Sequence, residues 1–125
     1  LTRLRTSNRD TADLLLARGL TGADWLTADS AEPKSVQDYK AYGLGCRAAQ
    51  KGPGSVEYSM KWLQALKRIV IDPARCPDTA RESSEYEYER DPRTGEVLPG
   101  YPDLCNHHID AVRYATEVIW KRRGA

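Results

Sequence analysis

The sequence predicts an α/β fold in which helices cover a mostly parallel central sheet. Short apolar runs typical of buried strands alternate along the chain with longer segments whose apolar residues recur at helical spacing. Strands that alternate with helices usually form a parallel sheet covered on both faces. The 125 residues, 40% hydrophobic and 30% charged, have a globular composition and suit one domain. We therefore expect residues 1–125 to belong to a single domain.

The first half of the chain is predicted to hold two helices and two strands. Asn8 can cap a helix that Gly19 ends, and Pro33 suits the first turn of the next helix, where a missing N–H does no harm. The expected elements, in order, are a helix over residues 8–18, a strand over 25–28, a helix from 33 to near 43 and a weak strand over 46–49.

The second half is predicted to end in a β-hairpin and a long helix. Ser55 can cap the helix that follows it, and Pro73 ends the clearest strand of the chain. Glutamate and tyrosine alternate at period two over residues 85–89, which is typical of a half-buried strand. The expected elements, in order, are a helix over 56–66, a strand over 69–71, a short polar helix over 76–84, a hairpin of 85–89 with 96–98 and a helix over 106–123.

Composition narrows the classes of function. Nineteen Lys and Arg against 18 Asp and Glu give a net charge of +1, so net charge does not support nucleic-acid binding, and such a case must rest on local chemistry. No apolar run approaches the ~20 residues of a membrane span. The three cysteines cannot all pair with one another, which favours a reducing compartment.

Asp29 is the first candidate for chemistry. It directly follows the apolar run 25–28 and precedes the helix that begins at Pro33. Ligands of α/β sheets bind at the carboxyl ends of strands, where an exposed carboxylate can hold a metal. The alternative is that Asp29 caps the following helix, as aspartate often does.

His107 and Asp110 form the second candidate group. Residues three apart share one face of a helix, so both stand together in the last predicted helix. Asp110 lies next to the apolar stripe, where a carboxylate needs a metal or a cationic partner. The alternative is an internal contact of Asp110 with Arg113 or Tyr114, without a ligand.

Two further patterns are weaker. Cys105, His107 and His108 are close in sequence, and Cys76 could join them in a zinc site, but no Cys-x-x-Cys or His-x3-His pair is present. The glycine-rich loop 51–55 could approach a phosphate, since glycines allow close backbone contact and Lys51 adds charge. It lacks the Gly-Lys-Ser/Thr ending of a P-loop, so an ordinary strand-to-helix turn is the alternative.

Four segments resemble, in order, the motifs of one protein family. ADSAEPKSV at residues 28–36 and NHHIDAVRYA at 106–115 are the specific matches. KGPGSV at 51–56, and Glu82 followed by Tyr86 and Tyr88, are weaker singly and useful in sequence. Together they cover almost the whole chain, which resembles the C-terminal nuclease domain of the large terminase subunit of tailed bacteriophages and prophages.

This resemblance implies a ribonuclease H-like fold and a metal-dependent endonuclease that cuts concatemeric viral DNA during genome packaging. Its acidic residues would hold two divalent ions, Mg²⁺ or Mn²⁺. Carried over by motif, Asp29 and Asp110 are metal-binding carboxylates and His107 is the active-site histidine. Glu32 lies in the first motif as site support. The implied partners are double-stranded DNA, the small terminase subunit and the portal protein, in the cytoplasm of a bacterial host and without a membrane.

Charge and position add three candidate phosphate contacts, Lys34, Lys51 and Arg113. One feature of the family pattern has no match, namely an acidic residue on the first strand of the sheet. Asp10 and Asp13 lie in a predicted helix and are poor substitutes. We therefore expect these residues to form part of the nuclease domain, without its N-terminal strands and without the ATP-hydrolysing motor, and to cleave poorly by themselves.

The alternative function belongs to another class. The chain would then be a non-catalytic α/β interaction module of a phage packaging complex, which binds DNA or packaging proteins without cutting. Metal-dependent cleavage that needs Asp29 and Asp110 distinguishes the nuclease from this module.

Overall fold

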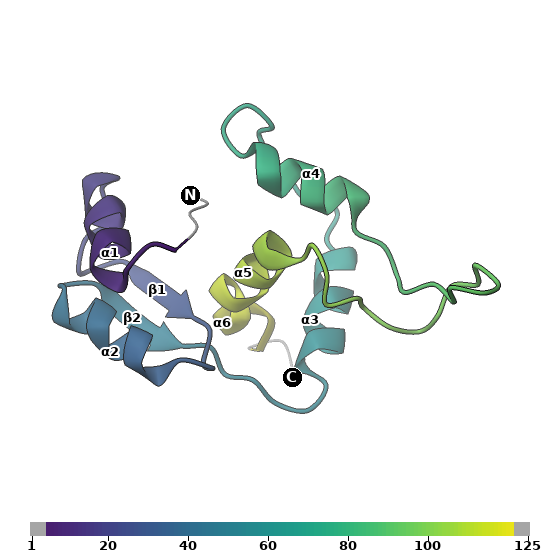
Figure 1. The fold of residues 1–125 in the computed structure, drawn as a ribbon, viewed down its shortest axis with the longest axis horizontal. Helices are drawn as coiled ribbons and strands as arrows, with labels where there is room; N and C mark the ends of the chain where they lie inside the picture. The colour runs from purple at the N-terminus through teal and green to yellow at the C-terminus, as the bar shows by residue number, and fades with distance from the viewer. Residues whose placement is uncertain (1–4, 122–125) are drawn as a thin grey trace. The chain divides into compact units, whose positions relative to one another are not determined.

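The structure is a computed structural model that describes residues 5–121 (Figure 1). The chain divides into two compact units, Leu1–Gly52 and Pro53–Ala125. The first unit contains a small parallel sheet with helices, and the second contains helices joined by long connections. The predicted α/β class is therefore confirmed.

The first unit follows the sequence closely. Its elements are α1 (Asn8–Ala17), β1 (Trp25–Ala28), α2 (Pro33–Ala41) and β2 (Gly45–Ala48). The two strands pair in parallel, with Trp25 opposite Gly45 and Ala28 opposite Ala48. The connecting helix α2 packs against both β2 and α1. All four predicted elements are confirmed, with ends that shift by at most two residues.

A glycine allows two backbone segments of this unit to lie close together at the start of β2. A Cβ on Gly45 would lie 2.7 Å from the backbone oxygen of Asp24, so only glycine fits at the start of β2. Five buried side chains form the core of the unit: Ala12, Val36, Leu44, Cys46 and Ala49. Burial also raises the pKa of the Cys46 thiol, which fits its place among apolar neighbours.

The cap of α1 differs from the prediction. Ser7, not Asn8, is the N-cap, and its Oγ accepts a hydrogen bond from the Asp10 backbone N–H at 3.1 Å. Asn8 is instead the first helical residue, and its Nδ2 donates to Asp38 Oδ2 at 3.0 Å and to Ser35 Oγ at 3.1 Å on α2. The Asn8 side chain, which was predicted to cap α1, therefore makes a tertiary contact with α2 instead.

The second unit is helical. Its elements are α3 (Ser55–Gln64), α4 (Pro77–Glu85), α5 (His107–Ala115) and α6 (Glu117–Lys121). α4 packs on α5, while α3 and α5 both contact α6. Trp120 is buried, with its ring centroid 5.8 Å from that of Tyr58. The helix prediction over 56–66 is confirmed, but the cap is wrong: Gly54, at φ 74°, precedes α3, and Ser55 is already helical.

Residues 69–71 do not form the predicted strand. The segment is irregular, with Ile69 57% and Val70 82% exposed. A strand requires a hydrogen-bonded neighbour, and among residues 5–121 only β1 and β2 form a ladder. Apolar, β-branched character favoured a strand here, but the described residues do not supply its partner.

The predicted hairpin is much shorter than its sequence pattern. One antiparallel bridge joins Arg90 to Val97, with Leu98 N–H donating to Glu89 O at 2.7 Å. The tyrosines of the alternating segment pack elsewhere: the Tyr86 hydroxyl donates to Pro102 O at 2.7 Å, and the Tyr88 and Tyr101 ring centroids lie 5.3 Å apart. The alternation of glutamate and tyrosine over residues 85–89 therefore reflects these contacts rather than a ladder.

The predicted helix over 106–123 is interrupted, and its residues 122–123 lie outside the described part. Thr116 caps the end of α5, and its hydroxyl donates to the Val112 carbonyl at 2.7 Å. Threonine competes with the backbone for such carbonyls and commonly bends or ends helices. The Trp120 indole N–H donates to Arg113 O at 3.0 Å, which ties α6 to the last turn of α5.

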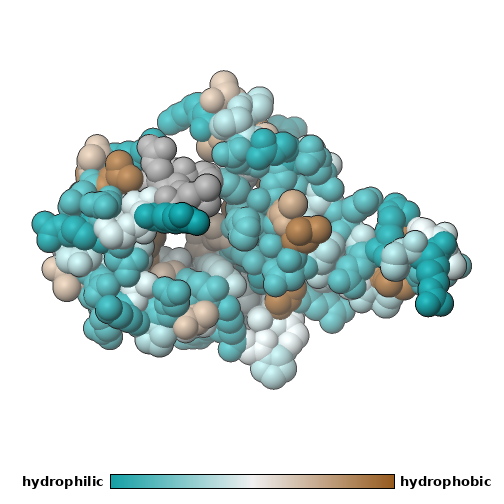
Figure 2. Space-filling model, in the orientation of Figure 1, coloured by the Kyte–Doolittle hydropathy of each residue, from teal (hydrophilic) through white to brown (hydrophobic). Residues whose placement is uncertain are grey.

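One face of the surface can be seen in the space-filling view (Figure 2). The face in Figure 2 is largely hydrophilic, and its apolar residues are scattered. Across residues 5–121, no helix combines the length and apolar character that a membrane span needs.

Candidate active site

Asp29 lies at the carboxyl end of β1, as the sequence predicts. Its side chain is 53% exposed, and Oδ1 accepts a hydrogen bond from the Ala31 backbone N–H at 3.0 Å. The N-cap of α2 is Glu32, so Asp29 does not cap that helix. The carboxylate closes a local turn and projects at the edge of the sheet, where ligands bind in α/β folds.

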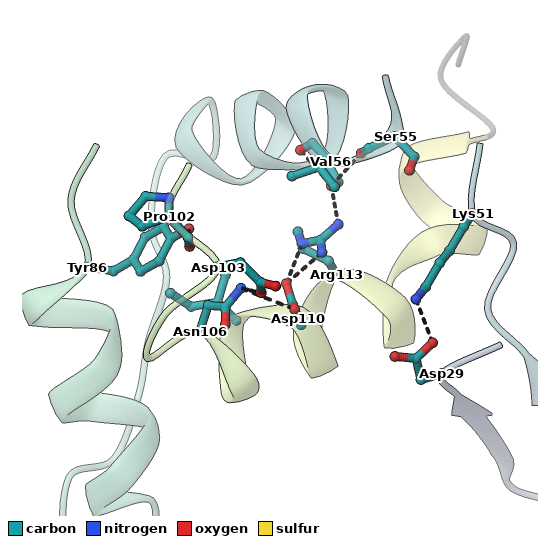
Figure 3. Close-up of polar contacts among 12 residues, drawn as sticks. Asp29, Lys51, Ser55, Val56, Tyr86, Pro102, Asp103, Asn106, Asp110 and Arg113 are labelled. Carbon is teal, nitrogen blue, oxygen red and sulfur yellow. Dashed lines mark hydrogen bonds and ion pairs between the residues drawn. The ribbon is translucent and has the colours of Figure 1, made fainter. Parts of the chain in front are cut away.

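Lys51 meets Asp29 at this edge (Figure 3). The Lys51 Nζ lies 2.6 Å from Asp29 Oδ1, and the lysine side chain is 46% exposed. Parallel register explains the contact: Ala28 is opposite Ala48, so the residues that follow both strands emerge at the same edge. The hydrogen bond from Lys51, followed by that from Ala31, holds the pKa of Asp29 below its ordinary value.

Glu32 and Lys34 lie near Asp29 in sequence, at the start of α2. Glu32 Oε2 accepts a hydrogen bond from Ser35 Oγ at 3.0 Å, which steadies the first turn of the helix. Lys34 is exposed, so its ammonium is accessible to a charged ligand.

Asp110 lies on α5 in the second unit and is 26% exposed. Its Oδ1 accepts hydrogen bonds from Arg113 Nε at 3.1 Å and Nη2 at 2.5 Å. Its Oδ2 accepts one from Asn106 Nδ2 at 3.3 Å, and the same amide donates to Asp103 Oδ1 at 3.2 Å (Figure 3). Asn106 thus links two carboxylates, of which Asp103 was not singled out from the sequence.

Arg113 is an internal residue. Its side chain is 5% exposed, and its Nη1 donates to Ser59 Oγ on α3 at 3.1 Å. A buried guanidinium needs paired acceptors, and Asp110 with Ser59 supplies them. Of the alternatives for Asp110, the structure contains the contact with Arg113.

His107 and His108 begin α5 and make different contacts. His107 is exposed at the first position of the helix, one turn before Asp110. His108 Nδ1 lies 2.9 Å from Thr79 Oγ1 on α4. Among residues 5–121, no three His, Cys, Asp or Glu side chains gather as a metal-binding group, so the zinc interpretation finds no ligand set there.

Glu82 has a role that spacing alone did not reveal. Its Oε1 accepts a hydrogen bond from the Ile109 backbone N–H at 2.7 Å, in the first turn of α5. The Asn106 side chain, at the N-cap, makes no hydrogen bond to the backbone N–H groups of this first turn. The Glu82 carboxylate from α4 accepts from one of those groups instead. The only sequence signal was the resemblance of Glu82, Tyr86 and Tyr88 to a family segment.

Comparison with known proteins identifies the family. A family model described as the terminase RNase H-like domain matches residues 11–118. The large terminase subunit of Bacillus phage SPP1 is 40% identical over 122 residues, which are 96% of this chain and 28% of that protein. The PBSX phage terminase large subunit of Bacillus subtilis (strain 168) is 30% identical over 92 residues, 74% of this chain and 21% of that protein.

A solved structure gives the same result for the fold. The nuclease domain of the SPP1 large terminase, crystallised with bound Mn, superposes with a TM-score of 0.83 at 38% sequence identity. The match covers 94% of this chain and 67% of that one. The chain thus spans between a fifth and a third of the curated relatives and most of the nuclease domain structure. The resemblance seen in the motifs and the ribonuclease H-like fold are therefore confirmed, and the chain belongs to the terminase RNase H-like domain family.

Proposed function

We propose that this chain is a metal-dependent endonuclease domain, which cuts concatemeric viral DNA during genome packaging. One observation carries the proposal: an exposed carboxylate, Asp29, stands at the carboxyl end of β1 in a chain that shares its fold and 38% of its sequence with a Mn-bound terminase nuclease domain. Residues 1–125 would form a single, partial nuclease domain. The non-catalytic interaction module is less favoured, because the SPP1 structure that this chain resembles is a nuclease domain.

The donor chemistry of the candidate residues fits a divalent ion. Mg²⁺ and Mn²⁺ prefer carboxylate oxygens, and Asp29 and Asp110 are the carboxylates that would bind them. Both carboxylates are held in place by hydrogen bonds, from Ala31 to Asp29 and from Asn106 to Asp110. Two bound ions would activate water and stabilise the leaving oxygen of a phosphodiester.

The other side chains would serve orientation, charge and proton transfer. Exposed His107 can position a phosphate or a water and move a proton. Lys34 and Lys51 are exposed cations suited to DNA phosphates. Arg113, buried against Ser59, is assigned to holding Asp110 rather than to a phosphate.

Membership of the family supports a proposed substrate and proposed partners. Double-stranded DNA is the proposed substrate, and the small terminase subunit and portal protein are the proposed partners in the parent assembly. The proposed place of DNA cleavage and of assembly with these partners is the cytoplasm of the bacterial host. Glu32 is proposed to support the site by fixing the turn between β1 and α2, through its bond with Ser35.

The experiment is a plasmid-nicking assay of the wild-type chain, Asp29→Asn and Asp110→Asn with Mn²⁺, Mg²⁺ or EDTA. We expect slow nicking that requires a divalent ion and falls by at least about 100-fold in each variant, since each loses a ligand charge. Thermal unfolding with and without Mn²⁺ provides a second readout, because a ligand at ~100 times its Kd stabilises by about 2.7 kcal/mol. Nicking that is unchanged in both variants contradicts the proposal, as does a wild-type chain that neither nicks DNA nor shifts with Mn²⁺.

A further inference from the structure

The ion pair between Lys51 and Asp29 occupies a carboxylate that the proposed nuclease needs. Lys51 Nζ and the Ala31 backbone N–H both contact Asp29 Oδ1, at 2.6 Å and 3.0 Å. Mg²⁺ binds carboxylate oxygens at about 2.0–2.1 Å. The lysine ammonium therefore stands at the same carboxylate as a coordinated ion would.

We propose that Lys51 is the counter-ion of Asp29 in the metal-free protein, and that a divalent metal displaces its ammonium. The displaced ammonium then becomes available to a DNA phosphate, so that metal binding prepares the site for its substrate. This inference rests on the proposed function, because it takes Asp29 as a metal ligand.

Electrostatics makes the two cations competitors. A divalent ion and an ammonium at the same carboxylate repel each other twice as strongly as two monovalent cations at the same distance, since the product of their charges is two. The metal attracts the carboxylate with twice the charge of the lysine. Once the ion is bound, Lys51 is therefore more stable at a distance from Asp29.

The lysine is held weakly enough to leave. Its side chain is 46% exposed and that of Asp29 is 53% exposed, and ion pairs at such exposed positions contribute little to stability. A lysine side chain is also a flexible stem with a strongly hydrated end, so it moves without a change of fold. Displacement by a metal of ordinary affinity is thus possible.

The carboxylate keeps its place when the lysine leaves. The Ala31 backbone N–H donates to Asp29 within the turn after β1, and Ala49 N–H donates to Ala28 O at 2.8 Å on the preceding residue. These bonds are independent of the Lys51 side chain. Removal of the ammonium therefore leaves an oriented carboxylate for the metal.

The test measures Mn²⁺ affinity directly, from the electron paramagnetic resonance signal of free Mn²⁺. Lys51→Met removes the ammonium and keeps the length of the stem, and we expect it to bind Mn²⁺ about three- to tenfold more tightly than the wild type. Lys51→Arg keeps the charge and should bind within about twofold of the wild type.

Lys61→Met is the matched control. Lys61 is also exposed and ion-paired, with Glu57 at 2.8 Å, so this variant makes the same change in net charge away from Asp29. We expect it to leave the Mn²⁺ affinity within about twofold of the wild type. An equal gain in Lys51→Met and Lys61→Met overturns the inference, because the effect is then one of net charge.

Asp29→Asn separates this inference from the proposed function. Loss of Mn²⁺ affinity in Asp29→Asn, with tighter binding in Lys51→Met, supports both. Loss in Asp29→Asn without a gain in Lys51→Met overturns the displacement alone. Mn²⁺ affinity that is unchanged in Asp29→Asn overturns Asp29 as a ligand, and with it both proposals.

A second measurement follows the ammonium itself. In the wild type, the side-chain NMR signals of Lys51 should shift on addition of diamagnetic Mg²⁺, while those of Lys61 stay in place. In Asp29→Asn the Lys51 signals should already be at the displaced position and should not respond. A Lys51 signal that ignores Mg²⁺ in the wild type overturns the inference.

Discussion

At the scale of single residues, Arg113 makes internal contacts with two helices of the second unit. Its guanidinium is 5% exposed and bonds both Asp110 on α5 and Ser59 on α3. Ser59 is itself fully buried and donates toward the carbonyls of the preceding turn. The charge of Asp110 is therefore positioned by a chain of contacts that crosses the second unit.

Loss of Arg113 should be costly. Arg113→Met leaves the Asp110 carboxylate without its cation, and we expect the free energy of unfolding in urea to fall by about 2–4 kcal/mol. Ser59→Ala removes one hydrogen bond and should lower it by about 1 kcal/mol. The control is Arg81→Met, which breaks an exposed pair with Asp78 and should cost less than about 0.5 kcal/mol. An Arg113→Met variant as mild as Arg81→Met contradicts the internal role.

The Lys51–Asp29 ion pair predicts that the free energy of unfolding depends on pH in metal-free buffer. Because Lys51 holds the pKa of Asp29 below its ordinary value, the unfolded chain binds this proton at a higher pH than the folded chain. The stabilisation is thus present above the unfolded pKa, about 3.9, and is lost as the pH falls through the folded pKa. It is small, since both side chains are about half exposed.

Carboxyl NMR titration of Asp29 checks this dependence. Its pKa should be lower in the wild type than in Lys51→Met, and Lys51→Arg should resemble the wild type. Equal pKa values of Asp29 in the wild type and Lys51→Met show that the ion pair is absent in solution.

At the scale of elements, side chains of α4 bond to the first turn of α5. Glu82 accepts from the Ile109 N–H, and Thr79 contacts His108, so both bonds come from one helix to the first turn of the next. This turn carries His107 and is followed by Asp110. A helix that carries candidate site residues is thus anchored by residues outside the candidate site.

Removal of this anchor should destabilise α5 locally. We expect Glu82→Ala to lower the free energy of unfolding by about 1 kcal/mol and to speed hydrogen exchange of the Ile109 amide, as loss of a cap does. Glu82→Gln keeps an acceptor and should be milder. The control is Glu85→Ala, an exposed residue at the end of the same helix. Unchanged exchange at Ile109 in Glu82→Ala contradicts the anchoring role.

Elements whose determinants are local could be predicted from the sequence. Pro33 begins α2, and Trp25–Ala28 forms β1 with Asp29 directly after it. The segment 69–71 has equally clear strand residues, but a strand depends on a partner that sequence periodicity does not provide. The break at Thr116 and the cap at Ser7 could not be predicted, because each depends on the contacts that particular side chains make. The Thr116 hydroxyl bonds to the Val112 carbonyl at the end of α5. Asn8 bonds to Asp38, and Ser7 is the cap of α1.

At the scale of the whole molecule, part of the candidate site could be predicted from the sequence and part could not. The motif positions of Asp29, His107 and Asp110 could be chosen from the sequence, because the family segments are short and specific. Their surroundings could not: Lys51 reaches Asp29 through strand register, and Ser59 reaches Arg113 across 54 positions of the chain. Tertiary structure thus decides which charges are neutralised and which are accessible.

The central claim is that Asp29 and Asp110 are metal ligands of a terminase nuclease domain. Diffraction from crystals of the chain grown with Mn²⁺, measured at the manganese absorption edge, tests it most directly. The account predicts anomalous density beside the carboxylates of Asp29 and Asp110, with the density at Asp29 absent from Asp29→Asn crystals. Anomalous density at neither carboxylate, in crystals that hold Mn²⁺ at other positions, would contradict it.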